Sequence, residues 1–237
     1  MIKISNRSIN EKSPCFIIAE AGINHNGSLR IAKKLISDAK KCGADAVKFQ
    51  TFKADDLSTK ESSYYKILKD LELDYKYFEE LSDYAKSKGI LFLSTPFSLE
   101  AVDLLNKIKV SAFKIAAGDL THLQLLKHAA KKGKPMLVST GMANIAEVKE
   151  AVSAIKSVKN NKIILLHSVS GYPYPPLEAN LLALDTLRKT FKYPVGFSDN
   201  GNTPLVSLVA VAMGANIIEK HFTLNKKMKG PDHKISS

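Results

Sequence analysis

Residues 15–49 read CFIIAEAGINHNGSLRIAKKLISDAKKCGADAVKF, and they contain one full repeat of the pattern that decides the fold. The repeat begins with the apolar run Cys15–Ala19, which is typical of a buried strand. In Leu29–Lys41 the apolar residues then recur with the period of an amphipathic helix. Gly43 follows where a helix would end in left-handed backbone, and the next apolar run is Ala46–Phe49.

The same alternation of strand and helix continues along the whole chain. The eight apolar runs expected to be strands are Cys15–Ala19, Ala46–Phe49, Ile90–Leu93, Ala112–Ile115, Pro135–Val138, Ile163–Leu166, Val195–Phe197 and Asn216–Ile218. The expected helix N-caps are Ser28, Asp74, Ser98 and Asn144, and the expected helix ends are Gly43, Gly89, Gly133 and Gly214. Alternating strands and helices predict parallel pairing with right-handed crossovers. Eight such units predict an α/β fold of the (β/α)₈ type, the TIM barrel.

We expect one domain that covers residues 1–237, with residues 1–13 as an N-terminal cap. Within this cap, residues 2–10 are predicted to form a small hairpin on the floor of the barrel. No G-x-G-x-x-G motif follows the first strand, which argues against a dinucleotide-binding sheet. The long polar connection between Gln50 and Asp74 is predicted to be a loop that lies over the barrel mouth.

Composition excludes several classes of function. The net charge is +12, but only Arg7, Arg30 and Arg188 among the 35 basic residues are arginine, so we expect no nucleic-acid partner. No apolar run reaches the roughly 20 residues that span a bilayer, and the N-terminus lacks a signal-peptide core. We therefore expect a cytoplasmic protein with no membrane partner. Cys15 and Cys42 are expected to be reduced thiols without a metal.

Two lysines interrupt apolar strands near the end at which TIM barrels place their active sites. Lys48 and Lys114 would both be buried, and a buried cation is costly unless it meets an anion. One interpretation is a phosphate cradle, and a second is internal pairing with Glu20 or Glu219. A third interpretation is a Schiff-base lysine like that of class I aldolases. Hydroxyl side chains at the other strand ends favour phosphate, and these are Thr95, Ser139 and Ser198.

The histidines differ in what they predict. His221, at the end of the last strand, is the best candidate for a metal ligand. His25 either binds substrate or orders its Asn/Gly-rich loop, and His167 could equally be a buried, hydrogen-bonded side chain. His122 and His128 lie in a helical segment and are expected to have surface or packing roles.

Seven motifs together resemble the N-acetylneuraminate (sialic acid) synthase family, which includes the legionaminic and pseudaminic acid synthases. The motifs are EAGINHNGS at residues 20–28, VKFQT at 47–51, STPFS at 94–98, FKIAAGD at 113–119, STGM at 139–142, IEKHFT at 218–223 and GPDHKIS at 230–236. The resemblance extends from about Phe16 to Ser236. The first and last motifs resemble the legionaminic and neuraminic branches more than the pseudaminic one.

The resemblance implies a barrel followed by a small antifreeze-like domain. It also implies condensation of phosphoenolpyruvate with an N-acetylmannosamine-type amino sugar, which gives a nonulosonic acid and phosphate with the aid of Mn²⁺ or Mg²⁺. The residues implied to bind phosphoenolpyruvate are Lys48, Thr95, Lys114, Ser139 and Ser198. Those implied to bind the sugar are Gln50, Asp119, Tyr172 and Asp232. The implied catalytic residues are Glu20 and Glu219, and the implied metal ligand is His221.

The sequence departs from the family pattern at three places. Asn200 replaces a second metal-binding histidine, which makes it the candidate second ligand, and Ala117 replaces a serine. The sequence ends at Ser237, before the final helix and the antifreeze-like domain, so we expect an exposed apolar face beside the last strand. A homodimer is expected where a C-terminal domain is present. A lysine-dependent aldolase, a barrel that binds ligand without turnover, and the identity of the acceptor sugar stay open.

Overall fold

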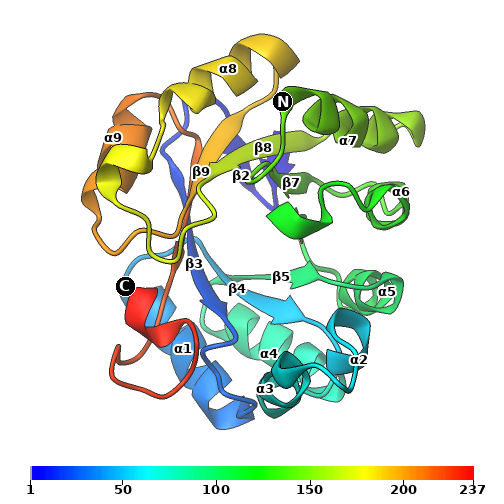
Figure 1. Ribbon diagram of the computed structural model, residues 1–237, viewed down its shortest axis with the longest axis vertical. Coiled ribbons are helices and arrows are strands. Elements are labelled where there is room, and N and C mark those ends of the chain that lie inside the picture. Colours follow the sequence, from blue (N-terminus) through cyan, green and yellow to red (C-terminus); the bar gives the residue numbers. More distant parts are fainter. Residues whose placement is uncertain (1) are drawn as a thin grey trace.

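The computed structural model describes residues 2–237 and shows a ring of eight parallel strands surrounded by helices (Figure 1). The ring strands are β3 (Phe16–Gly22), β4 (Ala46–Thr51), β5 (Leu91–Pro96), β6 (Phe113–Ile115), β7 (Met136–Ser139), β8 (Ile163–Ser168), β9 (Val195–Asp199) and β10 (Ile217–His221). Their hydrogen-bonded order is β5-β4-β3-β10-β9-β8-β7-β6, and contacts between β5 and β6 close the ring. The predicted (β/α)₈ barrel is therefore confirmed.

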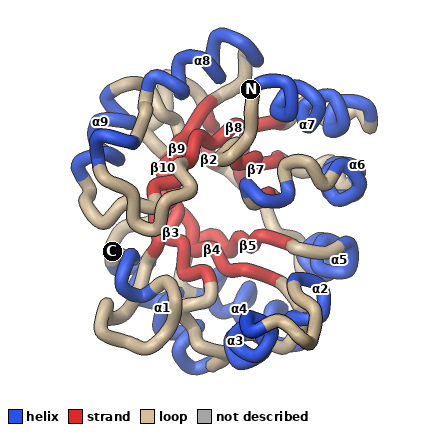
Figure 2. Tube along the Cα trace, in the orientation of Figure 1, coloured by secondary structure: helices blue, strands red, loops and turns tan. Residues whose placement is uncertain are grey.

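Helices connect consecutive strands and lie outside the ring (Figure 2). They are α1 (Leu29–Lys41), α4 (Lys76–Ser87), α5 (Leu99–Lys107), α6 (Leu123–Lys131), α7 (Ile145–Ser157), α8 (Leu182–Phe191) and α9 (Leu205–Ala212). Three-residue 3₁₀ turns occur at η1 (Ala117–Asp119), η2 (Pro176–Glu178) and η3 (His233–Ile235). No helix in residues 2–237 is long and apolar enough to cross a membrane.

Most of the predicted helix boundaries are confirmed. Ser28 and Ser98 cap α1 and α5 through their hydroxyls, and Asn144 forms a capping box with Glu147 at the start of α7. The glycines expected at helix ends all have left-handed backbone: Gly43, Gly89, Gly133 and Gly214. The prediction for Asp74 is wrong by one residue, because Tyr75 stands at the N-cap of α4 while Asp74 accepts a hydrogen bond from the Lys76 backbone.

The strands extend further toward their carboxyl ends than the apolar runs indicated. β5 continues to Pro96 and β10 continues to His221, so the polar residues expected just beyond these strands lie within them. The physical reason is that side chains alternate between the two faces of a strand. At the barrel mouth the inward face is polar, and a search for apolar runs therefore stops too early.

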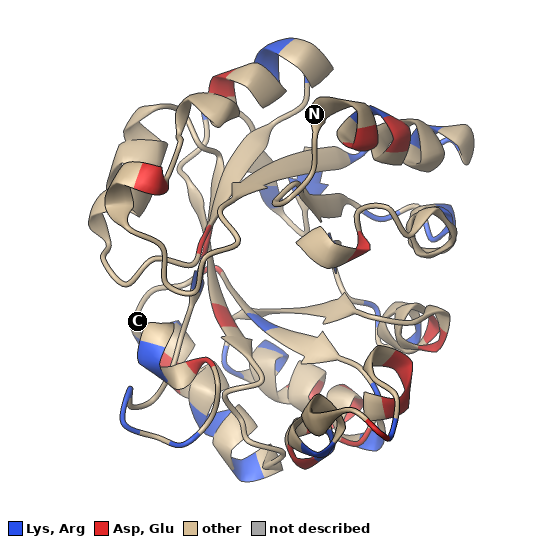
Figure 3. Ribbon diagram, in the orientation of Figure 1, with Lys and Arg blue, Asp and Glu red and all other residues tan. Residues whose placement is uncertain are grey.

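The inside of the barrel is filled in layers. Its lower layer is an apolar cluster that comprises Phe16, Ile18, Ala46, Leu93, Ala112, Leu137, Ile164, Leu166 and Ile217. The hairpin of β1 (Ile2–Ile4) and β2 (Arg7–Ile9) adds Ile2, Ile4 and Ile9 to this cluster and covers the floor. With the floor packed, the polar residues of the upper layer face the mouth. Charged residues otherwise lie mainly on the outer helices and the loops between them (Figure 3).

The connection from residue 50 to residue 74 is not the extended loop that its composition predicted. It contains α2 (Ala54–Leu57) and α3 (Ser63–Leu71). Leu71 packs with Ile23 and Phe52 in a small separate apolar cluster. These sparse apolar anchors escape a periodicity search because most residues around them are polar.

The outer face of β3 is incompletely covered. Ile17 points away from the ring and is 38% exposed, and Leu205 and Leu208 on the neighbouring part of the barrel, in α9, are exposed as well. Within residues 2–237, β10 is followed by an irregular segment and η3 rather than by an α-helix.

Candidate active site

Strand register places the polar residues of the upper layer beside one another. Glu20 on β3 pairs with Lys48 on β4, and His221 on β10 pairs with Glu20 from the other side. Glu219 on β10 is opposite Ser198 on β9. Because these strands are parallel and in register, residues that are far apart in the sequence occupy one side of the barrel mouth.

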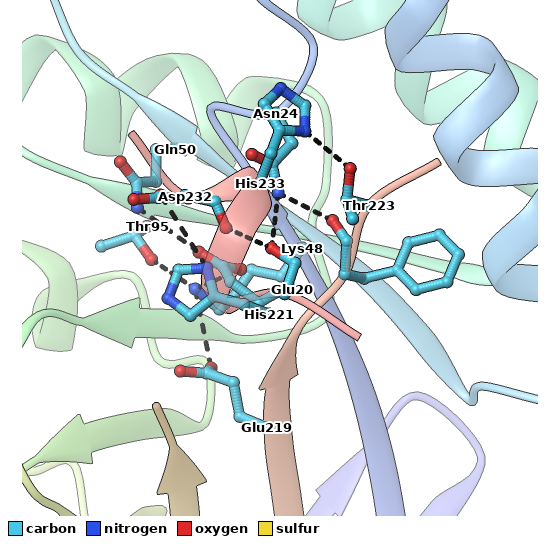
Figure 4. A network of polar contacts seen from close by, with 12 residues as sticks. Glu20, Asn24, Lys48, Gln50, Thr95, Glu219, His221, Thr223, Asp232 and His233 are labelled. Carbon is cyan, nitrogen blue, oxygen red and sulfur yellow. Dashed lines mark hydrogen bonds and ion pairs between the residues drawn. The ribbon is translucent and has the colours of Figure 1, made fainter. Parts of the chain in front are cut away.

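Two lysines and two glutamates form a buried ionic network at this level. Figure 4 shows three of them, Lys48, Glu20 and Glu219. Lys48 Nζ lies 2.7 Å from Glu20 Oε2 and 3.5 Å from Glu219 Oε2, and it donates to Thr95 Oγ1 at 2.9 Å. Lys114 Nζ lies 3.6 Å from Glu219 Oε1 and donates to its neighbour's carbonyl, Ile115 O, at 3.1 Å. The internal pairing that the sequence allowed is therefore present. Lys114 has much the poorer partners of the two lysines.

The two carboxyl groups of this network have opposite pKa shifts. Burial raises the pKa of Glu20 to about 7, against the opposing effect of Lys48. Burial also acts on Glu219, but the charges of Lys114 and Lys48 and the 2.8 Å hydrogen bond from Ser198 outweigh it and lower its pKa to about 2. Glu219 is thus a permanent anion at neutral pH. Glu20 can take up and release a proton there.

The two lysines also differ in pKa. Burial would lower the pKa of Lys48, but the carboxylates of Glu20 and Glu219 outweigh burial and raise it. For Lys114, burial outweighs the attraction of Glu219 and lowers the pKa. Lys114 is therefore the cation that gains most from an added anion.

Three of the four residues assigned to the sugar lie beside Glu20 and His221. Gln50 Nε2 approaches Glu20 Oε1 at 3.5 Å. The Asp232 carboxylate reaches the site from the segment after β10, with Oδ2 at 3.8 Å from His221 Nδ1. The Tyr172 ring stands edge-on to the His221 ring at 6.0 Å between centroids. Side chains from separate segments thus surround the ring of His221 and the carboxyl of Glu20.

Asp119, Ser139 and Ala117 belong to the opposite side of the mouth. Asp119 Oδ2 is buried without a hydrogen bond; burial raises the pKa of Asp119, opposed by His122 and Lys114. Ser139 is buried at the end of β7. A Cβ on Gly141 would come within 3.3 Å of Ala117 Cβ, so the position without the family serine lies next to the turn after β7.

The fit to a divalent metal rests mainly on His221. Its Nδ1 is buried without a hydrogen bond, burial lowers its pKa so that the imidazole is neutral, and Asp232 lies beside it. Asn200, by contrast, donates its amide hydrogens to Val169 O at 2.9 Å and Ser168 Oγ at 3.3 Å. Residues 2–237 contain no group of three or more His, Cys, Asp or Glu side chains that could hold a metal. His221 and Asp232 therefore suit a cation such as Mg²⁺ or Mn²⁺ that keeps water or substrate oxygens as its other ligands.

The other histidines have structural hydrogen bonds. His25 Nδ1 accepts from the Gly27 backbone at 3.0 Å, which orders the loop after β3, and burial lowers its pKa to about 4. His167 Nε2 is 2.8 Å from Ala179 O. His128 pairs with Asp103 on the outer surface.

Sequence reasoning missed a set of residues that fixes the segment carrying Asp232. His233 Nδ1 lies 2.6 Å from Thr223 Oγ1 (Figure 4). His233 Nε2 lies 3.3 Å from Asn26 Oδ1. Because Asn26 Oδ1 can only accept, His233 carries its proton on Nε2 and accepts from Thr223. The available signal was the GPDHKIS motif, in which the histidine follows Asp232 directly.

Comparison with known proteins identifies the family to which the chain is similar. Residues 35–237 match the NeuB family. The N,N'-diacetyllegionaminic acid synthase of Campylobacter jejuni is 49% identical over 236 residues, which cover 93% of this chain and 71% of that protein. An uncharacterized protein of Methanocaldococcus jannaschii is 51% identical over 236 residues, which cover all of this chain and 70% of that protein.

A solved structure has the same fold along the whole chain. The N-acetylneuraminic acid synthetase of Leptospira borgpetersenii, crystallised with citrate, superposes with a TM-score of 0.96 at 38% identity, covering 100% of this chain and 82% of that one. The resemblance seen in the motifs is thereby confirmed over both sequence and structure. The chain belongs to the NeuB family, the family of sialic, legionaminic and pseudaminic acid synthases.

Proposed function

We propose that this protein condenses phosphoenolpyruvate with an N-acetylmannosamine-type amino sugar to give a nonulosonic acid and inorganic phosphate. The observation that carries the proposal is the buried network of Lys48, Lys114, Glu20 and Glu219, with His221 beside it. A substrate with both a phosphate and a carboxylate needs more than one cation in a dry site. Lys114 in particular has its nearest carboxylate oxygen, Glu219 Oε1, at 3.6 Å, and its hydrogen bond goes to a backbone carbonyl.

In the proposed complex, the lysines and hydroxyls hold phosphoenolpyruvate. Lys48 and Lys114 stabilise its negative charges, and its phosphate oxygens accept from the hydroxyls of the neighbouring strands. These hydroxyls are Thr95, Ser139 and Ser198. Gln50, Asp119, Tyr172 and Asp232 bind the sugar around its aldehyde end.

The reaction then follows from the protonation states of the two glutamates. Carbon 3 of phosphoenolpyruvate bonds to the aldehyde carbon of the sugar, water adds at carbon 2, and the bond from carbon 2 to the phosphate oxygen breaks. Glu20, with a pKa of about 7, gives a proton to the new alkoxide and regains one from the added water. Glu219 stays ionised and stabilises the positive charge that develops at carbon 2. His221 and Asp232 would hold a divalent cation, which would supply Lewis acidity for activating the aldehyde.

The proposed acceptor class follows from the branch of the family. Because the C. jejuni relative is named for N,N'-diacetyllegionaminic acid, a diacetylated sugar should be tested beside N-acetylmannosamine. The assay incubates the protein with phosphoenolpyruvate, Mn²⁺ and both sugars, and it measures free phosphate together with the nonulosonic acid. Phosphate release without a nine-carbon product would contradict the proposal.

The alternative hypothesis, a lysine-dependent aldolase, has one observation in its favour, which is the lowered pKa of Lys114. Borohydride treatment in the presence of pyruvate distinguishes the two reactions. A stable pyruvyl adduct on Lys114 would indicate an aldolase, whereas the synthase forms no covalent bond to the protein. Binding of phosphoenolpyruvate without either product would indicate a barrel that binds but does not turn over.

A further inference from the structure

Asp199, at the carboxyl end of β9, is a buried carboxylate whose two oxygens are both occupied by protein donors. Its Oδ1 accepts from Tyr174 Oη at 2.7 Å and from the Gly201 backbone at 2.8 Å. Its Oδ2 accepts from Ser207 Oγ at 2.5 Å and Lys220 Nζ at 2.9 Å. Only 1% of the residue is exposed. A carboxylate so fully satisfied binds no ligand, so its function lies in the groups that it holds.

The side chain points away from the reacting centre. Its neighbour Ser198 faces the barrel interior and donates to Glu219, and successive side chains on a strand face opposite sides. Lys220 is the register partner of Asp199 on β10. Lys220 stands between Glu219 and His221 in the sequence, and these two residues face the inside of the barrel. The Asp199–Lys220 ion pair therefore holds β10 in place from its outer face.

Asp199 also fixes the peptide that carries Asn200. Its Oδ1 accepts from the Gly201 amide, and Lys220 Nζ donates to the Gly201 carbonyl at 2.6 Å. A Cβ at Gly201 would stand 3.0 Å from Asp199 Oδ1 and 3.2 Å from the Tyr174 ring. The chain after β9 is therefore held from both sides, and only glycine fits without a shift.

The third element held by Asp199 is the loop after β8. Tyr174 is 3% exposed, and burial, strengthened by Asp199, raises the pKa of its phenol, which therefore remains a donor. Two residues earlier in the same loop stands Tyr172, whose ring faces His221. A Cβ on Gly171 would lie 2.9 Å from Tyr174 Cβ, so the turn between residues 171 and 174 is tight.

We propose that Asp199 is the positioning residue for the acceptor side of the site. One carboxylate joins β9, β10 and the β8–α8 loop, and it thereby sets Asn200, His221 and Tyr172 relative to one another. Lys48 and Lys114 lie on β4 and β6 and donate hydrogen bonds to Thr95 and to Ile115 O, outside this cluster. They contact β10 only through Glu219, on the inner face of that strand. Disturbing the cluster should therefore weaken acceptor use while phosphoenolpyruvate binding persists. The inference rests on the proposed function for the identity of the acceptor.

Tyr174→Phe tests the proposal with the smallest perturbation, because it removes one hydrogen bond and leaves no buried charge unpaired. The acceptor KM should rise about tenfold, the usual effect of losing a bond to a charged group. The Kd of phosphoenolpyruvate, measured calorimetrically without sugar, should stay within about twofold of wild type. Tyr193→Phe is the matched control, since this half-buried tyrosine precedes β9 at the opposite end of the barrel and should change neither constant.

A pair of stronger variants separates position from charge. Asp199→Ala should lower kcat/KM for the acceptor by about a hundredfold, since misplacing reacting groups by about 1 Å has that effect. In the double variant Asp199→Asn/Lys220→Met, the amide oxygen of the substituted side chain still accepts from Tyr174 and Gly201, and no ammonium is left unpaired. The variant gives up only the bonds of Lys220, including the one to the Gly201 carbonyl. This variant should recover acceptor KM to within about threefold of wild type. Failure to recover in a protein with a normal melting temperature would overturn the proposal.

Amide hydrogen exchange provides a readout that does not depend on turnover. In Tyr174→Phe, exchange should accelerate in residues 170–174 and 200–203 and stay unchanged in residues 91–96. If wild type makes no nonulosonic acid, the proposed function fails, whatever these variants do. If wild type is active but Tyr174→Phe matches Tyr193→Phe in acceptor KM and in exchange, the positioning inference fails alone. Equal loss of phosphoenolpyruvate and acceptor binding would reduce Asp199 to a general structural role and overturn the inference.

Discussion

Replacing Lys48 and Lys114 separately with methionine should affect stability unequally while abolishing tight phosphoenolpyruvate binding in both cases. Methionine keeps an unbranched, flexible chain in the same space and removes only the ammonium group. The structure separates the two sites clearly. Lys48 has a carboxylate oxygen at 2.7 Å and a hydroxyl at 2.9 Å, whereas the nearest carboxylate oxygen to Lys114 is 3.6 Å away.

The magnitudes follow from these distances. Lys48→Met removes the cation paired with Glu20, and breaking a buried ion pair on one side costs about 3–5 kcal/mol. Because the pKa of Glu20 is already about 7, protonation of Glu20 keeps the loss near the lower end of that range. Lys114→Met leaves Glu219 with Lys48 and the Ser198 hydroxyl, and it also removes a cation whose pKa burial already lowers. We therefore expect a loss of about 1 kcal/mol or less at Lys114, because relief of desolvation offsets the lost attraction.

Substrate affinity should respond in a different order. Each lysine would make charge-assisted hydrogen bonds to phosphoenolpyruvate, and such bonds contribute about 1.5–3 kcal/mol. The Kd should therefore rise about 10- to 100-fold in both variants. Lys114→Met should thus be nearly as stable as wild type and still bind poorly, a combination that separates function from folding.

The assays are urea unfolding followed by circular dichroism, and titration calorimetry with phosphoenolpyruvate. Lys53→Met is the control, because that lysine pairs with Glu100 on the surface and should lose less than about 1 kcal/mol and no affinity. Equal stability losses at positions 48 and 114 would refute the inference that Lys48 is paired more strongly with the buried carboxylates than Lys114 is. Wild-type affinity in either variant would refute the assignment of that lysine to phosphoenolpyruvate.

Three further changes test other parts of the site. Asn200→His should raise Mn²⁺ affinity, measured by titration in the absence of substrate, because imidazole is a better ligand than an amide; an unchanged affinity would show that residue 200 faces away from the metal. The pKa of His25 is lowered from 6.5 to about 4, so wild type should lose up to roughly 3 kcal/mol of stability as pH falls through that window. His25→Gln should abolish this loss, and a persistent acid loss would contradict it. The pKa of Glu20 is raised from 4.5 to about 7, so its ionisation should lower stability as pH rises through that range, and Glu20→Gln should flatten this slope in denaturant unfolding. The two slopes oppose each other where their pH ranges overlap, so each is read from the difference between wild type and the single variant.

Much of the candidate site was visible in the sequence as separate pieces. Lys48 and Lys114 stood out because a lysine inside an apolar strand needs a partner, and both do lie in one network. Glu20 and Glu219 were named as alternative partners, and the structure shows them paired with those lysines. The sequence pattern could not tell which of these ion pairs is stronger. That order depends on the distances from the lysine nitrogens to the carboxylate oxygens, which range from 2.7 to 3.6 Å.

Other residues were invisible as functional residues for a physical reason. Asp199 appeared only as the middle of a Ser-Asp-Asn triplet, because its partners come from three different elements. The same holds for Asn24, whose amide donates to the carbonyl of Phe222, 198 residues further along the chain. Such pairs cannot be read from a single sequence, because the two residues meet only when the barrel closes.

Local chemistry alone therefore determined the elements and their kind: eight apolar runs, the caps at Ser28 and Asn144, and the left-handed glycines all act within a few residues. Tertiary structure alone decided which strand ends meet and that the Asn200 amide donates to Val169 O. It also decided that the polar connection between β4 and α4 folds into α2 and α3. The physical reason is range. Helix and strand preferences are set by neighbours along the chain, whereas the pKa values of Glu20 and Glu219 are set by burial and by charges that only barrel closure brings within 4 Å.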